Sequence, residues 1–132
     1  MQESKEKTIS IITVVKNAES TIERTIQSVL NQNYSNIEYI IVNGYSTDKT
    51  NEILEKYKDK INLIINKKDG GIWEAMNIGL EKATGDIVGF INADDYYYNG
   101  ALKIANHYFS SHQIDFLFGA VDKYKLMHGY KP

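Results

Sequence analysis

The sequence predicts an α/β fold, a doubly wound and mostly parallel sheet with helices on both faces. Runs of strand-forming apolar residues alternate along the chain with segments of helical periodicity, as is typical of this class. The runs are almost continuously apolar, which favours strands buried on both faces. One run, residues 87–91, leads into the adjacent carboxylates of Asp94 and Asp95. Carboxylates are not buried without partners, so we expect this pair just past a strand's carboxyl end, where ligands bind in such sheets.

Length and composition indicate one domain with no nucleic-acid or membrane-spanning character. The 132 residues carry a formal net charge of −2, so no basic surface points to nucleic acid. No apolar run approaches the roughly 20 residues of a membrane span, and the polar start lacks the core of a secretion signal. The absence of cysteine excludes disulfides and thiolate metal sites. We expect a cytoplasmic protein that can also lie peripheral to a membrane.

The first third of the chain predicts a strand and a capped helix. Residues 1–8 are polar and are expected to form a flexible arm, followed by a single domain over residues 9–132. Residues 9–15 are rich in β-branched side chains and predict the first strand. Ser20 can cap the next helix, and Glu23 stands three residues on, as a capping box requires. The apolar face of that helix is expected to contain Ile22, Ile26, Val29 and Leu30.

The middle of the chain repeats this alternation. Residues 37–42 predict the second strand, residues 43–48 have turn chemistry, and residues 61–65 predict the third strand. The helix between them is expected to turn Ile53, Leu54 and Tyr57 inward. A further helix follows the permissive glycine pair of residues 70–71, with Gly85 just past its end. Its inward face is expected to contain Trp73, Met76, Leu80 and Ala83.

The last third predicts a fourth strand over residues 87–91, a helix and a fifth strand over residues 114–118. The helix is expected to bury Leu102, Ala105 and Phe109. Right-handed crossovers and the doubly wound pattern predict a strand order of three-two-one-four. This order brings residues 13–15 beside residues 92–95, at an edge where four loops converge.

Two interpretations of Asp94 and Asp95 follow from the residues themselves. Adjacent carboxylates repel each other unless a cation joins them, and a hard divalent ion such as Mg²⁺ takes one or two carboxylates together with phosphate oxygens. The pair therefore fits a site for a metal and a diphosphate. Alternatively, both residues begin a turn or cap the following helix, where aspartate is common.

The chain resembles the donor-binding half of the family 2 glycosyltransferases, whose nucleotide-binding, Rossmann-like fold is called GT-A. Five segments occur in the family's order and carry the resemblance, which covers residues 9 to about 120: residues 12–17, 28–32, 41–50, 69–79 and 83–95. The resemblance implies a nucleotide-diphosphate sugar bound through Mg²⁺ or Mn²⁺. It also implies inverting transfer of the sugar to the hydroxyl of a sugar or lipid-linked acceptor, as in polysaccharide biosynthesis.

The resemblance assigns roles residue by residue. The implied donor-binding residues are Thr13, Val14, Val15, Glu19, Asn43, Asp69, Asn77, Asn92, Ala93 and Asp94. The resemblance also implies Asp94 as the principal metal contact, with Asp95 beside it. The sequence departs from the family at Asn92, which is neutral where the metal motif is usually acidic, and at Asn43, which replaces an aspartate near the base.

The catalytic base of the family lies well beyond the metal motif, so we expect it beyond Pro132 and assign no catalytic residue. This chain alone is therefore expected to be an incomplete and inactive enzyme. One alternative is a non-catalytic nucleotide-binding or assembly module with the same fold. A second is a flavodoxin-like signalling domain with Asp94 and Asp95 as a phosphoacceptor pocket, but that pocket needs acids after the first strand, where Lys16 and Asn17 stand.

The flank of the fourth strand predicts self-association. In the family that the chain resembles, this flank is covered by a later antiparallel strand. An uncovered apolar edge exposes unpaired backbone groups and recruits another strand. We therefore expect a homodimer or larger assembly formed through this sheet edge, with residues 114–130 supplying much of the contact. The alternative is a monomer whose own tail covers the edge.

Overall fold

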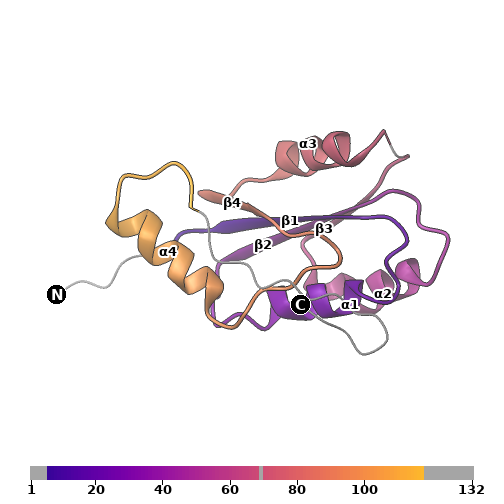
Figure 1. Cartoon of the computed structure of the whole chain (residues 1–132), viewed down its shortest axis with the longest axis horizontal. Coiled ribbons are helices and arrows are strands. Elements are labelled where there is room, and N and C mark those ends of the chain that lie inside the picture. Colours follow the sequence, from indigo (N-terminus) through magenta and orange to yellow (C-terminus); the bar gives the residue numbers. More distant parts are fainter. Residues whose placement is uncertain (1–5, 69, 118–132) are drawn as a thin grey trace, which may run out of the picture.

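The computed structural model describes residues 6–68 and 70–117, which form a four-stranded parallel sheet with helices on both faces (Figure 1). The strands are β1 (Ile9–Val15), β2 (Ile37–Asn43), β3 (Leu63–Asn66) and β4 (Ile87–Phe90). Their order, β3-β2-β1-β4, confirms the predicted arrangement. The winding reverses between β1 and β4, which are paired in parallel from Ile9 with Ile87 to Ile12 with Phe90.

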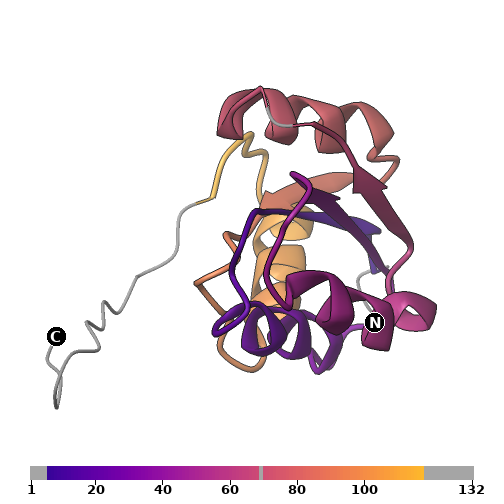
Figure 2. The same cartoon turned by 90° about the vertical axis from the view of Figure 1, so that its right-hand side faces the viewer.

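One helix covers one face of the sheet, and the remaining helices lie on the other (Figures 1 and 2). The helices are α1 (Ile22–Leu30), α2 (Thr50–Tyr57), the single turn η1 (Lys58–Lys60), α3 (Ile72–Lys82) and α4 (Ala101–Ser111). Helix α3 packs mainly on β1 and β2, while the larger core forms between the sheet and α1, α2 and α4. Alternate residues of β1 and β2 enter the two cores, which explains their continuous apolar character.

The buried face of α3 differs from the expected one. Gly79 is buried against Ile12, and a Cβ built on Gly79 would lie 2.5 Å from Cγ2 of Ile12. Trp73 and Leu80 are instead 77% and 46% exposed. Because only glycine permits this close approach of the helix to β1, Gly79 faces the sheet, and Ala75, Ile78 and the predicted Ala83 pack beside it. Trp73 and Leu80 point away from this core.

The predicted capping box of α1 does not form. The helix begins at Ile22 with Thr21 as its N-cap residue, and no side chain caps it. The Glu23 carboxylate instead accepts hydrogen bonds from Nζ of Lys56 at 2.7 Å and from the hydroxyl of Tyr57 at 2.6 Å. The lysine first, and then the tyrosine, lower the pKa of Glu23. This acid therefore joins α1 to α2 rather than closing the first turn of its own helix.

The residues just before β1 are hydrogen-bonded to the rest of the chain. The backbone N of Thr8 donates to Oδ2 of Asp86 at 3.0 Å, and its carbonyl accepts from the backbone N of Ile87 at 3.1 Å. Residues 6–8 are thus bound to the chain, while residues 1–5 lie outside the described part. Gly85 does not follow directly on α3, which ends at Lys82; it lies against Thr8 and Ser10, where a Cβ would come within 3 Å of both.

The predicted fifth strand is wrong for residues 114–117, which have no strand structure, and residue 118 lies outside the described residues. Within the described ranges, β4 is therefore the last strand on its side of the sheet. No helix in these ranges is long and apolar enough to cross a membrane.

Candidate functional site

The carboxyl ends of all four strands meet at one edge of the sheet, because every strand pair is parallel. The loops after β1, β2, β3 and β4 begin at this edge, as the strand order predicts. The sequence-predicted site residues lie on these four loops, on the strand ends or on α3, except Asp69, which lies outside the described residues. The site is therefore a rim of loops above a buried sheet.

The loops after β1 and β2 are fastened together by side chains that the sequence analysis did not single out. Oδ1 of Asn17 accepts hydrogen bonds from the backbone N of Thr47 at 2.7 Å and of Asp48 at 3.3 Å. The backbone N of Asn17 donates to Oγ of Ser46 at 2.9 Å, and the backbone N of Glu19 donates to Oδ2 of Asp48 at 3.0 Å. Asn17 has a φ of 53°, a left-handed conformation that asparagine tolerates. The two loops thus form one body.

Asn43 organises the same region from below. It is 1% exposed, and its Nδ2 donates to Oδ1 of Asn51 at 2.7 Å and to Oδ1 of Asn66 at 3.0 Å. Its Oδ1 accepts from Oγ of Ser46 at 2.7 Å and from the backbone N of Ser46 at 3.4 Å. Both hydrogens and both acceptor positions of the carboxamide are therefore occupied. Asn43 joins β2, β3 and the loop before α2, and keeps no hydrogen-bonding position for a ligand.

The end of β1 forms the buried floor of the rim. Thr13 is fully buried, with its hydroxyl 2.9 Å from the hydroxyl of Tyr39, and Val15 is also buried. Val14 is partly exposed on the face covered by α3. The backbone N of Gly44 donates to the carbonyl of Val15 at 2.9 Å, so the pairing of β1 and β2 continues into the loops.

The turn after β4 is anchored on α1. Oγ1 of Thr25 donates to the carbonyl of Ala93 at 3.0 Å, and the backbone N of Asp95 donates to the carbonyl of Asn92 at 3.0 Å. Ala93 is buried, whereas Asn92, Asp94 and Asp95 are exposed. The aspartates therefore lie in a turn, as one interpretation expected. They do not cap α4, whose N-cap residue is Gly100 and which has no side-chain cap.

The oxygen ligands at this turn fit a hard divalent cation. The carboxylates of Asp94 and Asp95 are exposed, and neither forms a salt bridge with another described residue. Within residues 6–68 and 70–117, no three histidine, cysteine or acidic side chains gather to form a complete metal site. Mg²⁺ and Mn²⁺ accept one or two carboxylates when a ligand's phosphate oxygens and water complete the coordination. The turn therefore suits a metal that arrives with a phosphorylated ligand.

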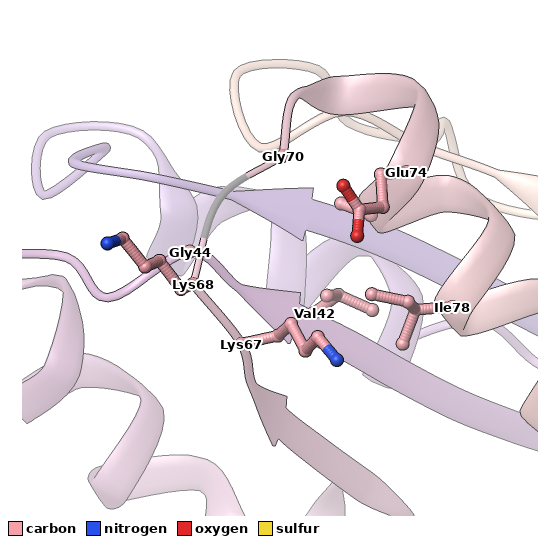
Figure 3. A pocket seen from close by; sticks show the side chains of 8 residues that line it. Val42, Gly44, Lys67, Lys68, Gly70, Glu74 and Ile78 are labelled. Carbon is pink, nitrogen blue, oxygen red and sulfur yellow. The ribbon is translucent and has the colours of Figure 1, made fainter.

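A small pocket opens at the other end of the rim, between the ends of β2 and β3 and the start of α3 (Figure 3). Lys67 and Glu74 stand on opposite sides of it, with Val42 and Ile78 between them (Figure 3). Asn77 is exposed on the same helix. This end of the rim therefore combines an apolar floor with charged groups of both signs.

The comparisons with known proteins agree with this architecture. The family model Glycosyl transferase family 2 matches residues 10–131. An uncharacterized glycosyltransferase of Haemophilus influenzae is 41% identical over 113 residues, which cover 79% of this chain and 45% of that protein. The chain thus spans less than half the length of this relative.

Two solved structures are also similar to this chain. The structure of Staphylococcus aureus TarS 1–349 in complex with UDP-GlcNAc has a TM-score of 0.73 and 32% identity, covering 80% of this chain and 32% of that one. The mannosyltransferase PcManGT of Pyrobaculum calidifontis, in complex with GDP-Man and Mn²⁺, has a TM-score of 0.68 and covers 78% of this chain and 32% of that one. At 23% identity, the second likeness shows the shared fold alone.

Proposed function

The chain belongs to glycosyltransferase family 2, and we propose that its rim binds a nucleotide-diphosphate sugar through a divalent metal, for inverting transfer of the sugar to an acceptor hydroxyl. The observation that carries this proposal is the pair of exposed carboxylates, Asp94 and Asp95, on a turn anchored at the switch point between β1 and β4. TarS, which is similar over most of this chain, binds UDP-GlcNAc.

The metal contributes one element of the chemistry. When bound, Mg²⁺ or Mn²⁺ neutralises the charge that develops on the leaving nucleoside diphosphate. Asp94 and Asp95 hold the cation, and Asn92 offers a neutral carbonyl oxygen beside them. The hydrogen bond from Thr25 to Ala93 fixes this turn before the donor arrives, so little reorganisation accompanies binding.

The remaining predicted donor residues divide into two groups by exposure. We propose direct donor contact for residues with exposed or partly exposed side chains at the rim, namely Val14, Glu19 and Asn77. We propose that the buried residues shape the rim without touching the donor through their side chains, namely Thr13, Val15, Asn43 and Ala93. A donor contact by Asp69 stays a prediction.

Transfer also needs a general base that accepts the proton of the acceptor hydroxyl. We assign this role to no described residue, and a base beyond Pro132 stays a prediction. A sugar or lipid-linked acceptor, a role in polysaccharide biosynthesis and a cytoplasmic location are likewise proposals. The flavodoxin-like alternative is excluded by the family membership of the chain.

Isothermal titration with UDP, with and without Mn²⁺, tests the proposal. We expect Mn²⁺ to strengthen UDP binding to the parent, and Asp94→Ala to abolish that gain while its unfolding temperature stays unchanged. Asp59→Ala is the matched control, because Asp59 is an exposed acid of η1 at the opposite edge of the sheet. If Asp94→Ala keeps the full gain from Mn²⁺, the metal assignment is wrong. Tight binding that is indifferent to metal would favour the non-catalytic nucleotide-binding module.

A further inference from the structure

We propose that the ring of Tyr45 forms a wall on which the nucleobase of the donor stacks, and that Tyr45 thereby governs how strongly the rim binds nucleosides. This inference rests on the proposed function, since it names the part of the donor that one end of the rim recognises. It starts from a backbone conformation that a tyrosine rarely adopts.

Tyr45 lies two residues past the end of β2 and has a φ of 52°. A bulky residue in the left-handed region is a genuine outlier, whereas glycine adopts that conformation without strain. The side chain is nevertheless 58% exposed, so burial of the ring does not compensate for the strain. Strained residues persist where their surroundings impose the conformation, and they cluster at ligand-binding sites. The strain and the exposure together indicate a ring held for contact with a ligand.

The neighbours of Tyr45 hold its backbone in place. The backbone N of Gly44 donates to the carbonyl of Val15 at 2.9 Å, which fixes the residue before it. Ser46, the residue after it, is bound to the buried carboxamide of Asn43 through both its hydroxyl and its backbone N. Tyr45 is thus presented from a loop that is hydrogen-bonded on both sides, so its backbone is fixed before a ligand binds.

Tyr45 also forms one wall of a groove of about 510 Å³ between α2 and β3. Leu54 and Ile64 supply apolar surface, Asn51 and Asn66 stand on the rim, and the charged side chains of Glu55 and Lys58 line the groove as well. Hydrogen bonds from Asn43 orient both of these carboxamides. An apolar hollow with a few oriented polar groups is the usual form of a small-molecule site. A planar ring with hydrogen-bonding edges, such as a nucleobase, matches an aromatic wall beside fixed amides.

The position of the groove relative to Asp94 and Asp95 favours the base over other parts of the donor. Tyr45 follows β2 and the acidic turn follows β4, and these strands are separated by β1 alone. Two strand spacings amount to about 10 Å. A nucleoside diphosphate carries its aromatic group at one end and its charged oxygens at the other. With the diphosphate at the acidic turn, the base is directed along the rim toward Tyr45.

Three variants of the full chain test the inference. Tyr45→Gly removes the ring and suits the left-handed backbone, Tyr45→Phe keeps the stacking face, and Tyr108→Ala removes an exposed ring from α4, away from the rim. Each is titrated with pyrophosphate and with UDP, CDP, ADP and GDP in the presence of Mn²⁺. Pyrophosphate reports the acidic turn without a base.

We expect Tyr45→Gly to weaken the tightest nucleoside diphosphate about 10-fold or more, in line with measured base–aromatic stacking. Its pyrophosphate affinity and its unfolding temperature should not fall, and Tyr45→Phe and Tyr108→Ala should bind as the parent does. If Tyr45→Gly binds the nucleotide within twofold of the parent, or is less stable than the parent, the inference is overturned while the proposed function stands. If the parent binds neither pyrophosphate nor any nucleotide, both fail.

Discussion

Oδ1 of Asn17 accepts a hydrogen bond of 2.7 Å from the backbone N of Thr47, 30 residues further along the chain. The same oxygen accepts from the backbone N of Asp48, so one short side chain satisfies two donors of the neighbouring loop. The loops after β1 and β2 are therefore a single unit, and the rim depends on an acceptor at position 17 rather than on a charge.

Two substitutions of Asn17 distinguish the contribution of its side-chain acceptor from that of its left-handed backbone conformation. Asn17→Gly tolerates the positive φ but leaves the two backbone donors unpaired, so we expect a loss of about 1–2 kcal/mol in the free energy of unfolding. Asn17→Asp keeps the acceptor oxygen and should lose less. Urea unfolding of both variants measures the difference. Equal losses would show that the hydrogen bonds to the loop after β2 contribute nothing to stability.

The hydrogen bonds of the Asn43 side chain require an amide, which both donates and accepts. In Asn43→Asp the side chain can no longer donate to Asn51 and Asn66, so we expect a loss of about 1–3 kcal/mol at pH 7. Burial raises the pKa of an aspartate placed there, and its protonated form regains one donor. The stability of the variant relative to the parent should therefore rise as the pH falls from 7 to 5. A pH-independent difference between the two proteins would contradict this explanation.

The sequence predicted the site residues that follow the end of a strand. It did not predict the residues whose hydrogen bonds hold the loops together. Asp94 and Asp95 could be placed from the apolar run that precedes them, because carboxylates must leave a buried sheet. The structural role of Asn43 could not be predicted, since its partners Asn51 and Asn66 come from two other elements. The residue type alone does not tell whether an asparagine binds a ligand or holds neighbouring segments together. The turn chemistry of residues 43–48 was recognisable, but not its bonds to Asn17.

Glu23 links α1 to α2 in a pH-dependent way. Because Lys56 and Tyr57 lower its pKa, the stabilisation that it provides is fully present above the ordinary pKa of glutamate, about 4.3. The stabilisation is lost as the pH falls through the lower pKa of the folded state. We expect Glu23→Gln to be less stable than the parent at pH 7 and equal to it in strong acid. Unfolding curves across this range, with Glu81→Gln as an exposed control, measure the effect. A difference that persists in strong acid would contradict it.

The alternation of apolar runs with helical segments was enough to predict the strand order, because parallel strands joined by right-handed crossovers allow few topologies. It did not suffice for the face of α3. Trp73 and Leu80 looked like core residues by size, yet the helix packs through Gly79, where the absence of a side chain decides the contact. Hydrophobicity alone does not detect a position at which two backbones approach closely.

Gly79→Ala therefore tests the packing of α3. The added methyl would lie 2.5 Å from Cγ2 of Ile12, so α3 must move away from β1. Overpacking of this kind costs about 1–3 kcal/mol and should outweigh the better helix propensity of alanine, about 1 kcal/mol. We expect net destabilisation in urea, whereas Glu81→Ala on the exposed side should be neutral or slightly stabilising. A Gly79→Ala variant as stable as the parent would show that the helix adjusts freely.

The outer flank of β4 bears on the predicted homodimer. The backbone N of Ile87 donates to Thr8 and that of Ile91 to Ile12, so these groups point toward β1. In an alternating ladder, the N–H groups of Val88 and Phe90 point outward. Both side chains are also exposed, and within the described ranges no strand pairs with this flank. An apolar edge strand with free donors recruits another strand.

Val88→Pro removes one outward donor without removing a hydrogen bond to β1, so it should block pairing at this edge while the sheet persists. We expect the parent to be a dimer at tens of micromolar by light scattering behind a sizing column, and Val88→Pro to be a monomer with the same far-ultraviolet circular dichroism. A parent that is strictly monomeric would refute the dimer. A Val88→Pro variant that still dimerises would move the contact away from the β4 edge, because proline at that position cannot donate to a pairing strand.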